Sequence, residues 1–461
     1  MTRKIKGRRK VVAEAKKQID LLVSRIEGLI KGAESEYLFH LVYYFPNIFA
    51  ELAKERRIYE HYFIYNIKWL RATNGLSLAL NRILPKHLPL KHPSMLNIRK
   101  LEKTFRKNLF LLLDTCYDIG KWLYISENKY VDRITVDDGK PESYYRGKDS
   151  SAFQEYVDRV AVDEGYARWL SWFYSKLREN HELINALDAY FQREYGFGLD
   201  DIRNASMYLE KLVEGNRVIV PRNEVHKVFT KNIRSGRADR LLKELTFDGS
   251  GKDLFKSPLI PLRGGYFLIA KWVFSFGMHF ESWVRPAIES EEIYGIYSDF
   301  IGRTFEKYVK DNIGPLVDAV RSNVKITKKR YPSIKHGFEI DMIAVKGNFA
   351  FLISCKGGKK ELPKLQLSKM WAEFPEKEIR HRIRENKREI KEVWEQYETL
   401  TSNKRILEDL GLEGKKIIPL VVYATVQPLS LEKIKNMYEI PWPVSVVTVE
   451  ELKSIIMNVR E

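Results

Sequence analysis

The stretch from Gly337 to Gly358 constrains the fold more than any other part of the chain. It holds two apolar runs, FEIDMIAV and FAFLISC, on either side of Gly347-Asn348. Two strand-like runs joined by a two-residue turn predict a tight β-hairpin. A two-residue loop also sets the register, because it makes Lys346 the cross-strand partner of Phe349.

This register places polar side chains together at the open end of the predicted hairpin. Asp341 lies opposite Ser354, and Glu339 lies opposite Lys356. Side chains two residues apart share a face of a strand, so these four project from one side. The other side is apolar and is expected to face the core: it carries Ile340, Met342, Ile353 and Cys355.

A cluster of carboxylate, hydroxyl and ammonium groups is costly to bury, so a wet cleft is expected beside it. A carboxylate such as that of Asp341 suits Mg²⁺, a hard cation that keeps several waters. An ammonium such as that of Lys356 can balance charge on a phosphate. These are the parts needed to hydrolyse a phosphodiester. The alternative is a solvated sheet face with a cross-strand ion pair between Glu339 and Lys356.

The order of elements around the hairpin predicts an α/β domain at the C-terminus. A helix from Trp283 to Ile313 is expected to end at Gly314-Pro315, a helix-stop signal. Strands separated by a long helix are typical of an α/β domain. The predicted strands are 323–328, 338–345, 349–355, 416–425 and 444–448, and the predicted helix is 376–400.

Glu306 on the helix, then Asp341, then Ser354-x-Lys356 resembles the pattern of the PD-(D/E)XK, or restriction-endonuclease-like, nuclease superfamily. The resemblance covers residues 291–461 and implies an α/β/α domain with a mixed sheet. It implies that Asp341 is the principal metal ligand and Lys356 the catalytic lysine. It also implies that Glu306 assists the metal and that the cofactor is Mg²⁺ or Mn²⁺. A water activated by this metal would then cleave nucleic acid.

Ser354 departs from this pattern, because the superfamily usually has an acidic residue two positions before the lysine. Glu339 lies on the same face and is the candidate to replace that carboxylate, which makes Asp341, Glu306 and Glu339 the expected metal ligands. The departure also leaves a second hypothesis open. In this hypothesis the domain is a catalytically decayed nuclease scaffold that acts as a nucleic-acid-binding or assembly protein.

The rest of the chain is expected to be mostly helical up to residue 215. The polar stretch 134–151 predicts an exposed loop. Residues 216–290 form a mixed connecting segment, with two short strands around Arg263-Gly264-Gly265. The predicted fold class is therefore α+β and multidomain: a helical domain for substrate or partner recognition, a connector, and the nuclease-like domain.

The charge of the chain favours a polyanionic partner. Lys and Arg number 79 against 61 Asp and Glu, for a net charge of +18. We expect DNA as the substrate. Lys359 and Lys360 are candidate phosphate contacts beyond the third predicted strand, and Lys387 and Lys391 are candidates on the following helix. The alternative for all four is a solvated surface, since the helix is also rich in glutamate.

Several other expectations follow from composition. Two cysteines cannot form a disulfide framework, which indicates a reduced, cytoplasmic protein. No apolar run is long enough to cross a membrane. The high charged fraction is typical of proteins from hot environments. Paired cuts would need two active sites, so a homodimer is considered. Arg56 and His61 match the short motif of metal-independent HEPN ribonucleases, which is the third hypothesis for function.

Overall fold

The structure is a computed structural model, and the chain in it divides into two compact units. One contains residues 1–143 and 182–294, and the other contains residues 144–181 and 295–461. Each unit is therefore assembled from two separate segments of the chain. The sequence instead predicted three consecutive parts, 1–215, 216–290 and 291–461. The structure describes residues 3–30, 38, 42, 72, 75–92, 98–127, 131–142, 152, 155, 156, 159, 164–177, 179–215, 217–233, 235–249, 254–271, 273, 274, 278–357 and 376–459.

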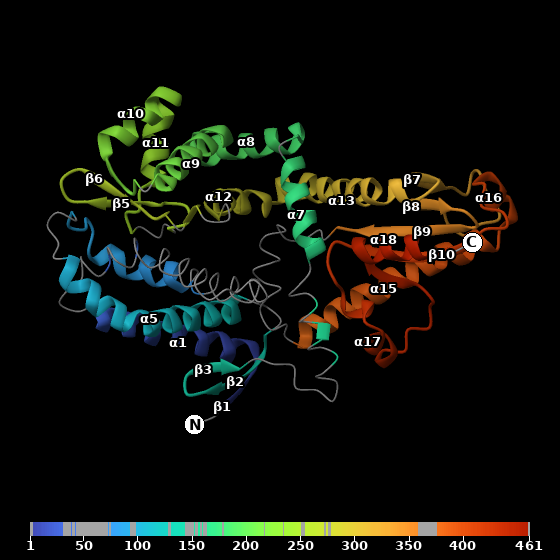
Figure 1. The fold of residues 1–461 in the computed structure, drawn as a ribbon, viewed down its shortest axis with the longest axis horizontal. Coiled ribbons are helices and arrows are strands. Elements are labelled where there is room, and N and C mark those ends of the chain that lie inside the picture. Colours follow the sequence, from blue (N-terminus) through green and yellow to red (C-terminus); the bar gives the residue numbers. More distant parts are fainter. Residues whose placement is uncertain are drawn as a thin grey trace. The chain divides into compact units, whose positions relative to one another are not determined.

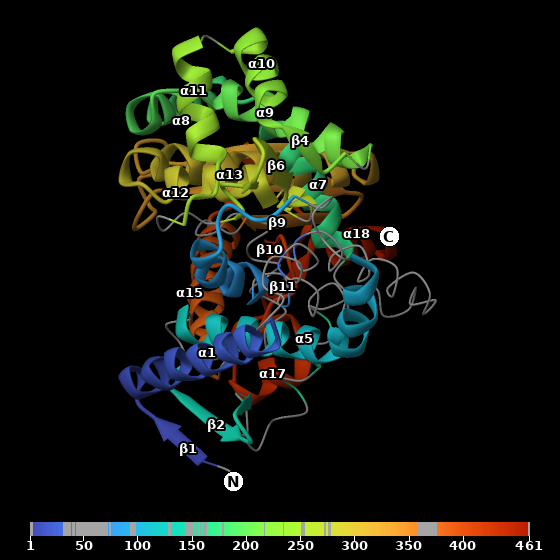
Figure 2. The same cartoon turned by 90° about the vertical axis from the view of Figure 1, so that its left-hand side faces the viewer.

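The first unit begins with two long helices that lie side by side (Figures 1 and 2). A three-stranded antiparallel sheet in the order β1-β2-β3 accompanies them. The helices carry apolar stripes at helical spacing, of which Val11, Ala15 and Ile19 are buried. The elements are β1 (Arg3–Lys6), α1 (Arg8–Ile30), the 3₁₀ turn η1 (Leu84–Lys86), α5 (Ile98–Glu127), β2 (Arg133–Asp137) and β3 (Lys140–Glu142).

The prediction of a loop over 134–151 is wrong at its beginning, because β2 and β3 form a hairpin there. Asp138 and Gly139 have φ values of 46° and 75°, as a two-residue turn between twisted strands requires. The alternation of Ile134, Thr135 and Val136 was the sequence signal for the strand. The charged residues after it hid that signal.

The second half of the first unit combines, among its described residues, five helices with a small antiparallel sheet in the order β4-β6-β5. The two short strands predicted around Arg263-Gly264-Gly265 are β5 and β6. The elements are α8 (His181–Tyr195), α9 (Leu199–Glu214), β4 (Ile219–Pro221), α10 (Arg222–Asn232), α11 (Ser235–Leu245), β5 (Leu259–Leu262), β6 (Tyr266–Ile269) and α12 (Met278–Ile288).

The second unit is built on a five-stranded mixed sheet in the order β11-β10-β9-β8-β7 (Figure 1). Strands β7, β8 and β9 are antiparallel neighbours, and β10 and β11 continue the sheet parallel to β9. The elements are α7 (Glu164–Leu177), α13 (Glu291–Ile313), η4 (Gly314–Leu316), β7 (Ala319–Ile326), β8 (Phe338–Lys346), β9 (Phe349–Lys356), α15 (Glu376–Thr401), α16 (Lys404–Asp409), β10 (Lys416–Tyr423), η5 (Pro428–Ser430), α17 (Glu432–Met437), β11 (Ser445–Thr448) and α18 (Val449–Asn458).

The predicted hairpin and its register are confirmed. Lys346 pairs with Phe349 across the Gly347-Asn348 turn, and the ladder continues to Met342 and Ile353. The predicted single helix from Trp283 to Ile313 is wrong, because the chain forms α12 and α13 instead. The break lies at Ser290, whose carbonyl accepts the first N–H groups of α13, those of Ile293 at 3.2 Å and Tyr294 at 3.0 Å.

Helices α15 and α18 lie on opposite faces of this sheet. Lys346 of β8 donates a hydrogen bond of 2.7 Å to the carbonyl of Ile456 in α18. Lys356 of β9 forms an ion pair of 2.7 Å with Glu389 in α15. The hairpin register puts Lys346 and Lys356 on opposite faces, because side chains alternate along each strand.

Helix α7 packs against α13 through a cluster of aromatic rings. The Trp169 ring meets the Phe305 ring edge to face at 5.1 Å, and the Trp172 and Tyr308 rings lie 5.3 Å apart. Such pairs add to the energy of burial alone. Trp169 is buried and fills a core, the role the sequence favours for aromatic residues on apolar helical faces. Among the helices within the described ranges, none is long and apolar enough to cross a membrane.

Candidate active site

The Asp341 carboxylate is held by the strand beside it. Its Oδ2 atom accepts a hydrogen bond of 2.7 Å from the backbone N–H of Cys355 and one of 3.2 Å from the Ser354 hydroxyl. The ladder between β8 and β9 ends at Met342 and Ile353, one residue before this position. The backbone N–H of Cys355 therefore donates to the Asp341 carboxylate, and this hydrogen bond joins the two strands beyond the end of the ladder. Both bonds go to Oδ2, so Oδ1 is the oxygen that they leave available.

The neighbouring strand is distorted at the same level. The register of β7 on β8 puts Asn323 opposite Asp341, and this pair is missing from an otherwise regular ladder. Asn323 has a φ of 55°, in the left-handed region that non-glycine residues seldom adopt. Asparagine tolerates this conformation better than most residues. The strained backbone thus coincides with the carboxylate that the sequence selected, which is where functional sites often store strain.

Lys356 is half-buried and paired with a carboxylate that the sequence analysis did not select. Its Nζ lies 2.7 Å from Oε2 of Glu389, and the side chains of the two residues are 28% and 13% exposed. Burial alone would lower the pKa of Lys356, but the hydrogen bond and charge of Glu389, with Asp341 and Glu392, raise it overall. Burial would raise the pKa of Glu389, and the contacts with Lys356 and Arg388 lower it instead. The pair is therefore ionised.

Helix α13 reaches the end of β9 and brings Glu306 with it. A Cβ atom on Gly357 would lie 2.8 Å from Cβ of Phe305, so only glycine allows this approach. Burial raises the pKa of the Cys355 thiol, and the Asp341 and Glu306 carboxylates raise it further. Both carboxylates thus act on the same thiol, and Lys356 opposes them. Asp341 and Lys356 thus lie at the same end of the hairpin, and Glu306 is close enough to act on Cys355.

A buried polar network lies on the α15 side of the sheet, beyond Lys356. Tyr423 of β10 is the parallel neighbour of Lys356, and its hydroxyl accepts a hydrogen bond of 2.9 Å from Nδ2 of Asn386. Asn386 also lies 3.4 Å from Oε1 of Gln427. Burial raises the pKa of the Tyr423 hydroxyl, and the Glu389 charge adds to this. The spacing Asn386-x-x-Glu389 places both residues on one face of α15, and this was the available sequence signal.

Other residues selected from the sequence lie away from this cluster. The ion pair between Glu339 and Lys356 that the alternative interpretation required is not formed: Glu339 pairs with Lys325 of β7 at 3.8 Å and is 47% exposed. The Lys387 ammonium lies 5.6 Å from the centre of the Tyr438 ring. Lys391 pairs with Glu395 on the same exposed side of α15. Lys359 and Lys360, like Arg56 and His61, lie outside the described residues.

The possible metal ligands here are carboxylate oxygens, which a hard cation prefers when it takes only one or two ligands from the protein. Within the described ranges there is no group of three or more His, Cys, Asp or Glu side chains placed to hold a metal ion. Mg²⁺ is commonly bound by one or two carboxylates, with waters and substrate phosphates completing its shell. Asp341 through Oδ1, with Glu306, would be the protein ligands of such an ion.

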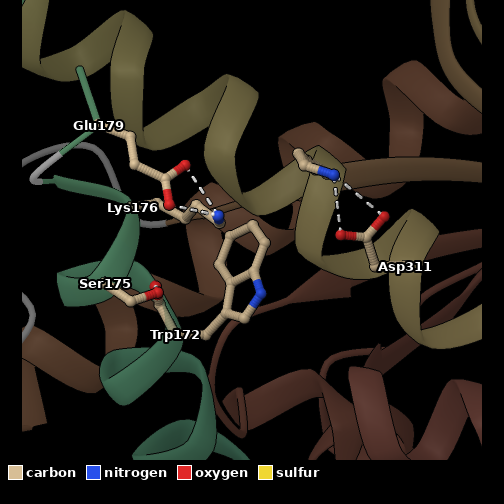
Figure 3. Close-up of polar contacts among 6 residues, drawn as sticks. Trp172, Ser175, Lys176, Glu179 and Asp311 are labelled. Carbon is tan, nitrogen blue, oxygen red and sulfur yellow. Dashed lines mark hydrogen bonds and ion pairs between the residues drawn. The ribbon is translucent and has the colours of Figure 1, made fainter. Parts of the chain in front are cut away.

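Helices α7 and α13 also border a cleft of about 410 Å³ at the surface of the second unit. Trp172 projects into it, and Lys176 lies 5.9 Å from the centre of its ring (Figure 3). Lys176 pairs with Glu179 at 2.7 Å, and Lys307 pairs with Asp311 at 3.0 Å (Figure 3). Two of the cations at this cleft, Lys176 and Lys307, are thus balanced by carboxylates from their own segments.

Comparison with known proteins adds little to this description. No family model and no curated protein matches the chain. Among solved structures, the crystal structure of protein VC1899 from Vibrio cholerae is matched at 12% sequence identity and a TM-score of 0.18. The match covers 85% of this chain and 86% of that chain. A TM-score this low carries no argument about fold or function.

Proposed function

We propose that the second unit is a metal-dependent nuclease of the PD-(D/E)XK class that hydrolyses phosphodiester bonds in DNA. The observation that carries the proposal is that Asp341 and Lys356 lie at one end of the β8–β9 hairpin, with Glu306 of α13 close enough to affect the pKa of Cys355. The order of elements supports it: a helix with an acidic residue, three antiparallel strands, a helix, and a strand parallel to the third. Helices α15 and α18 on opposite faces of the mixed sheet give three layers, which agrees with the α/β/α arrangement that the resemblance implies.

Each side chain has a role that follows from its contacts. The raised pKa of Lys356 keeps it a cation, so it is suited to contact a phosphate oxygen and stabilise developing negative charge. Glu389 holds that ammonium in place. Ser354 donates to Asp341 and therefore orients the carboxylate. In this proposal the hydroxyl serves as a positioning group and is not a metal ligand.

The proposed cofactor is Mg²⁺ or Mn²⁺. When bound, such an ion supplies Lewis-acid polarisation of the phosphate. Asp341 and Glu306 would hold it, and Cys355 and Ser354 fix the Asp341 carboxylate by their two hydrogen bonds. Double-strand cuts would require two copies of the site, and therefore a pair of chains.

A second candidate function is nucleic-acid binding without cleavage. It is favoured because the two central side chains, Asp341 and Lys356, already have partners within the protein. Asp341 already accepts two hydrogen bonds, and the Lys356 charge is already balanced by Glu389. A decayed site that keeps its shape through internal contacts would have these features. The two candidates differ in whether any bond is cut.

The test is cleavage of end-labelled single-stranded DNA, duplex DNA and RNA by the full-length protein, with Mg²⁺, Mn²⁺ or EDTA. Asp341→Asn is compared with Asp311→Asn, which removes an exposed carboxylate from α13 (Figure 3). Thermal melting of each variant checks its folding. We expect metal-dependent cutting of DNA that is lost in Asp341→Asn and kept in Asp311→Asn.

Two results would overturn the proposal. Binding without cutting in either metal would favour the decayed scaffold. Cutting that resists EDTA and survives Asp341→Asn would place the chemistry elsewhere, and His61 would then be replaced to test the ribonuclease hypothesis.

A further inference from the structure

The segment from α9 to β6 in the first unit has the chain order of a winged helix-turn-helix. A helix (α9) is followed by a short strand (β4), two helices (α10 and α11) and a two-stranded hairpin (β5 and β6). The first strand pairs with the last, which gives the sheet order β4-β6-β5. Helices α10 and α11 are separated only by residues 233 and 234. A helix-turn-helix likewise joins its two helices by a short turn, of about 3–4 residues.

The three helices share one apolar core, so the segment is a packed module. Phe229 of α10 is buried, and its ring lies 6.2 Å from that of Tyr208 on α9. Helix α11 buries Ala238, Leu241 and Leu245, which follow one another at helical spacing. The opposite side of α11 is exposed and polar.

The hairpin is tied to the start of α10. The backbone N–H of Arg222 donates a hydrogen bond of 2.9 Å to the carbonyl of Gly265. Gly264 and Gly265 have φ values of 83° and 80°, which let the chain turn tightly at the tip. A groove of about 1010 Å³ runs between the helices and this tip. We call it the winged face, and its lining includes Arg222 and His226 of α10, Asp239 and Lys243 of α11, and Gly264 and Gly265.

The exposed charges of the module are mostly positive. Between residues 222 and 266, six exposed side chains among the described residues are basic and two, Asp239 and Asp248, are acidic. Asp239 is also paired with His226 at 2.8 Å. The six exposed basic residues are Arg222, Lys227, Lys231, Arg240, Lys243 and Arg263. Arg222, Lys243, Asp239 and Asp248 line the groove, and the other four, all basic, lie outside its lining. The excess over the whole segment matches a phosphate backbone.

The shape of the module selects among nucleic acids. The major groove of B-form DNA admits an α-helix, and the second helix of a helix-turn-helix lies there. The major groove of A-form RNA is too narrow for side chains to read. We infer that the winged face binds duplex DNA, with α11 in the major groove and the Arg263-Gly264-Gly265 tip against the backbone. This site is separate from the proposed nuclease site and does not depend on it.

The test is binding of a fluorescent DNA duplex by the full-length protein in EDTA, measured by anisotropy over a KCl series. Cutting is not measured, so failure of the nuclease proposal leaves the assay unchanged. Lys243→Glu in the winged face and Arg263→Glu at the hairpin tip beside Gly264 are compared with Lys211→Glu, an exposed lysine of α9 away from both. All three reverse one exposed charge. We expect weaker binding in the first two, and a slope of log Kd against log salt that is shallower by about 1 for each lost phosphate contact.

Two results would overturn this inference. One is that Lys243→Glu and Arg263→Glu bind the duplex with the same Kd and salt slope as Lys211→Glu, which would leave the winged face to a protein partner. The other is that an RNA duplex of the same length binds as tightly as the DNA duplex.

Discussion

Replacing Glu389 by glutamine removes the charge that balances Lys356 and leaves the size of the side chain almost unchanged. The pair joins α15 to the end of β9 at 2.7 Å, and both side chains are largely buried. Breaking a fully buried pair costs about 3–5 kcal/mol, whereas an exposed pair contributes about 0–1 kcal/mol. Lys356 keeps partial access to water, so we expect a loss of about 2 kcal/mol.

The assay is amide hydrogen exchange of peptides from α15, because it reports local opening in a chain with two units. A loss of about 2 kcal/mol corresponds to exchange that is faster by roughly 30-fold, since about 1.4 kcal/mol is a factor of ten. The control is Glu408→Gln, which breaks an exposed pair with Lys404 at 3.5 Å in the same unit. The double variant Glu389→Gln/Lys356→Met should recover most of the loss. Equal exchange in Glu389→Gln and Glu408→Gln would refute the reasoning.

The same pair gives a dependence on pH with a definite sign. The pKa of Glu389 is lowered from its ordinary 4.5, so its contribution is complete above that value and is lost as pH falls through the folded-state pKa. The pKa of Lys356 is raised from its ordinary 10.5, so its contribution is complete below that value and is lost as pH rises through the folded-state pKa. Protection of α15 should therefore be insensitive to pH between these limits.

Three further substitutions test the surroundings of the site. Gly357→Ala should destabilise the protein by about 1–3 kcal/mol, because its Cβ would lie 2.8 Å from Phe305. The control is Gly302→Ala on α13, whose Cβ would have nothing within 4 Å and which should not lower the melting temperature. Equal melting temperatures of the two variants would contradict the close approach. Asn323→Val should lower the free energy of unfolding, measured with urea, by about 1–2 kcal/mol, because the residue has a φ of 55°. Asn323→Gly should not lower it. An unchanged stability of the valine variant would argue against strain in this strand. Tyr423→Phe removes the nearer of the two acceptors of the Asn386 amide and leaves only Gln427 at 3.4 Å, so it should cost about 1 kcal/mol by the same method. Unfolding like that of the wild type would contradict this.

The hairpin could be predicted from the sequence because its determinants are local. Gly347-Asn348 fixed the turn, the turn fixed the register, and the period of two assigned Asp341 and Ser354 to one face. The contact between the Asp341 carboxylate and the Ser354 hydroxyl agrees with that assignment. The choice of Glu306 rested on the order of several elements along the chain. Helix α13, which carries it, does lie against the end of β9.

The partner of Lys356 could not be predicted in this way, because it depends on how α15 packs on the sheet. Glu389 is one of many glutamates in that helix, and only the packed structure shows which of them faces β9. The same holds for Asn386 and Tyr423, which come from separate elements. The strands β2 and β3 were missed for a different reason, since a short hairpin in a charged stretch has a weak apolar signal.

The most direct test of the proposed function is the initial rate at which Lys356→Gln cleaves duplex DNA in Mg²⁺, relative to the wild type. The matched control is Lys404→Gln, a lysine of α16 whose two glutamate partners, Glu408 and Glu413, resemble the Lys356 pair in chemistry. Loss of a preorganised group that stabilises transition-state charge lowers rates by about 10²–10³-fold. A nuclease site at Lys356 should give a loss of that size with Lys404→Gln at the wild-type rate. Equal rates in all three proteins would contradict it.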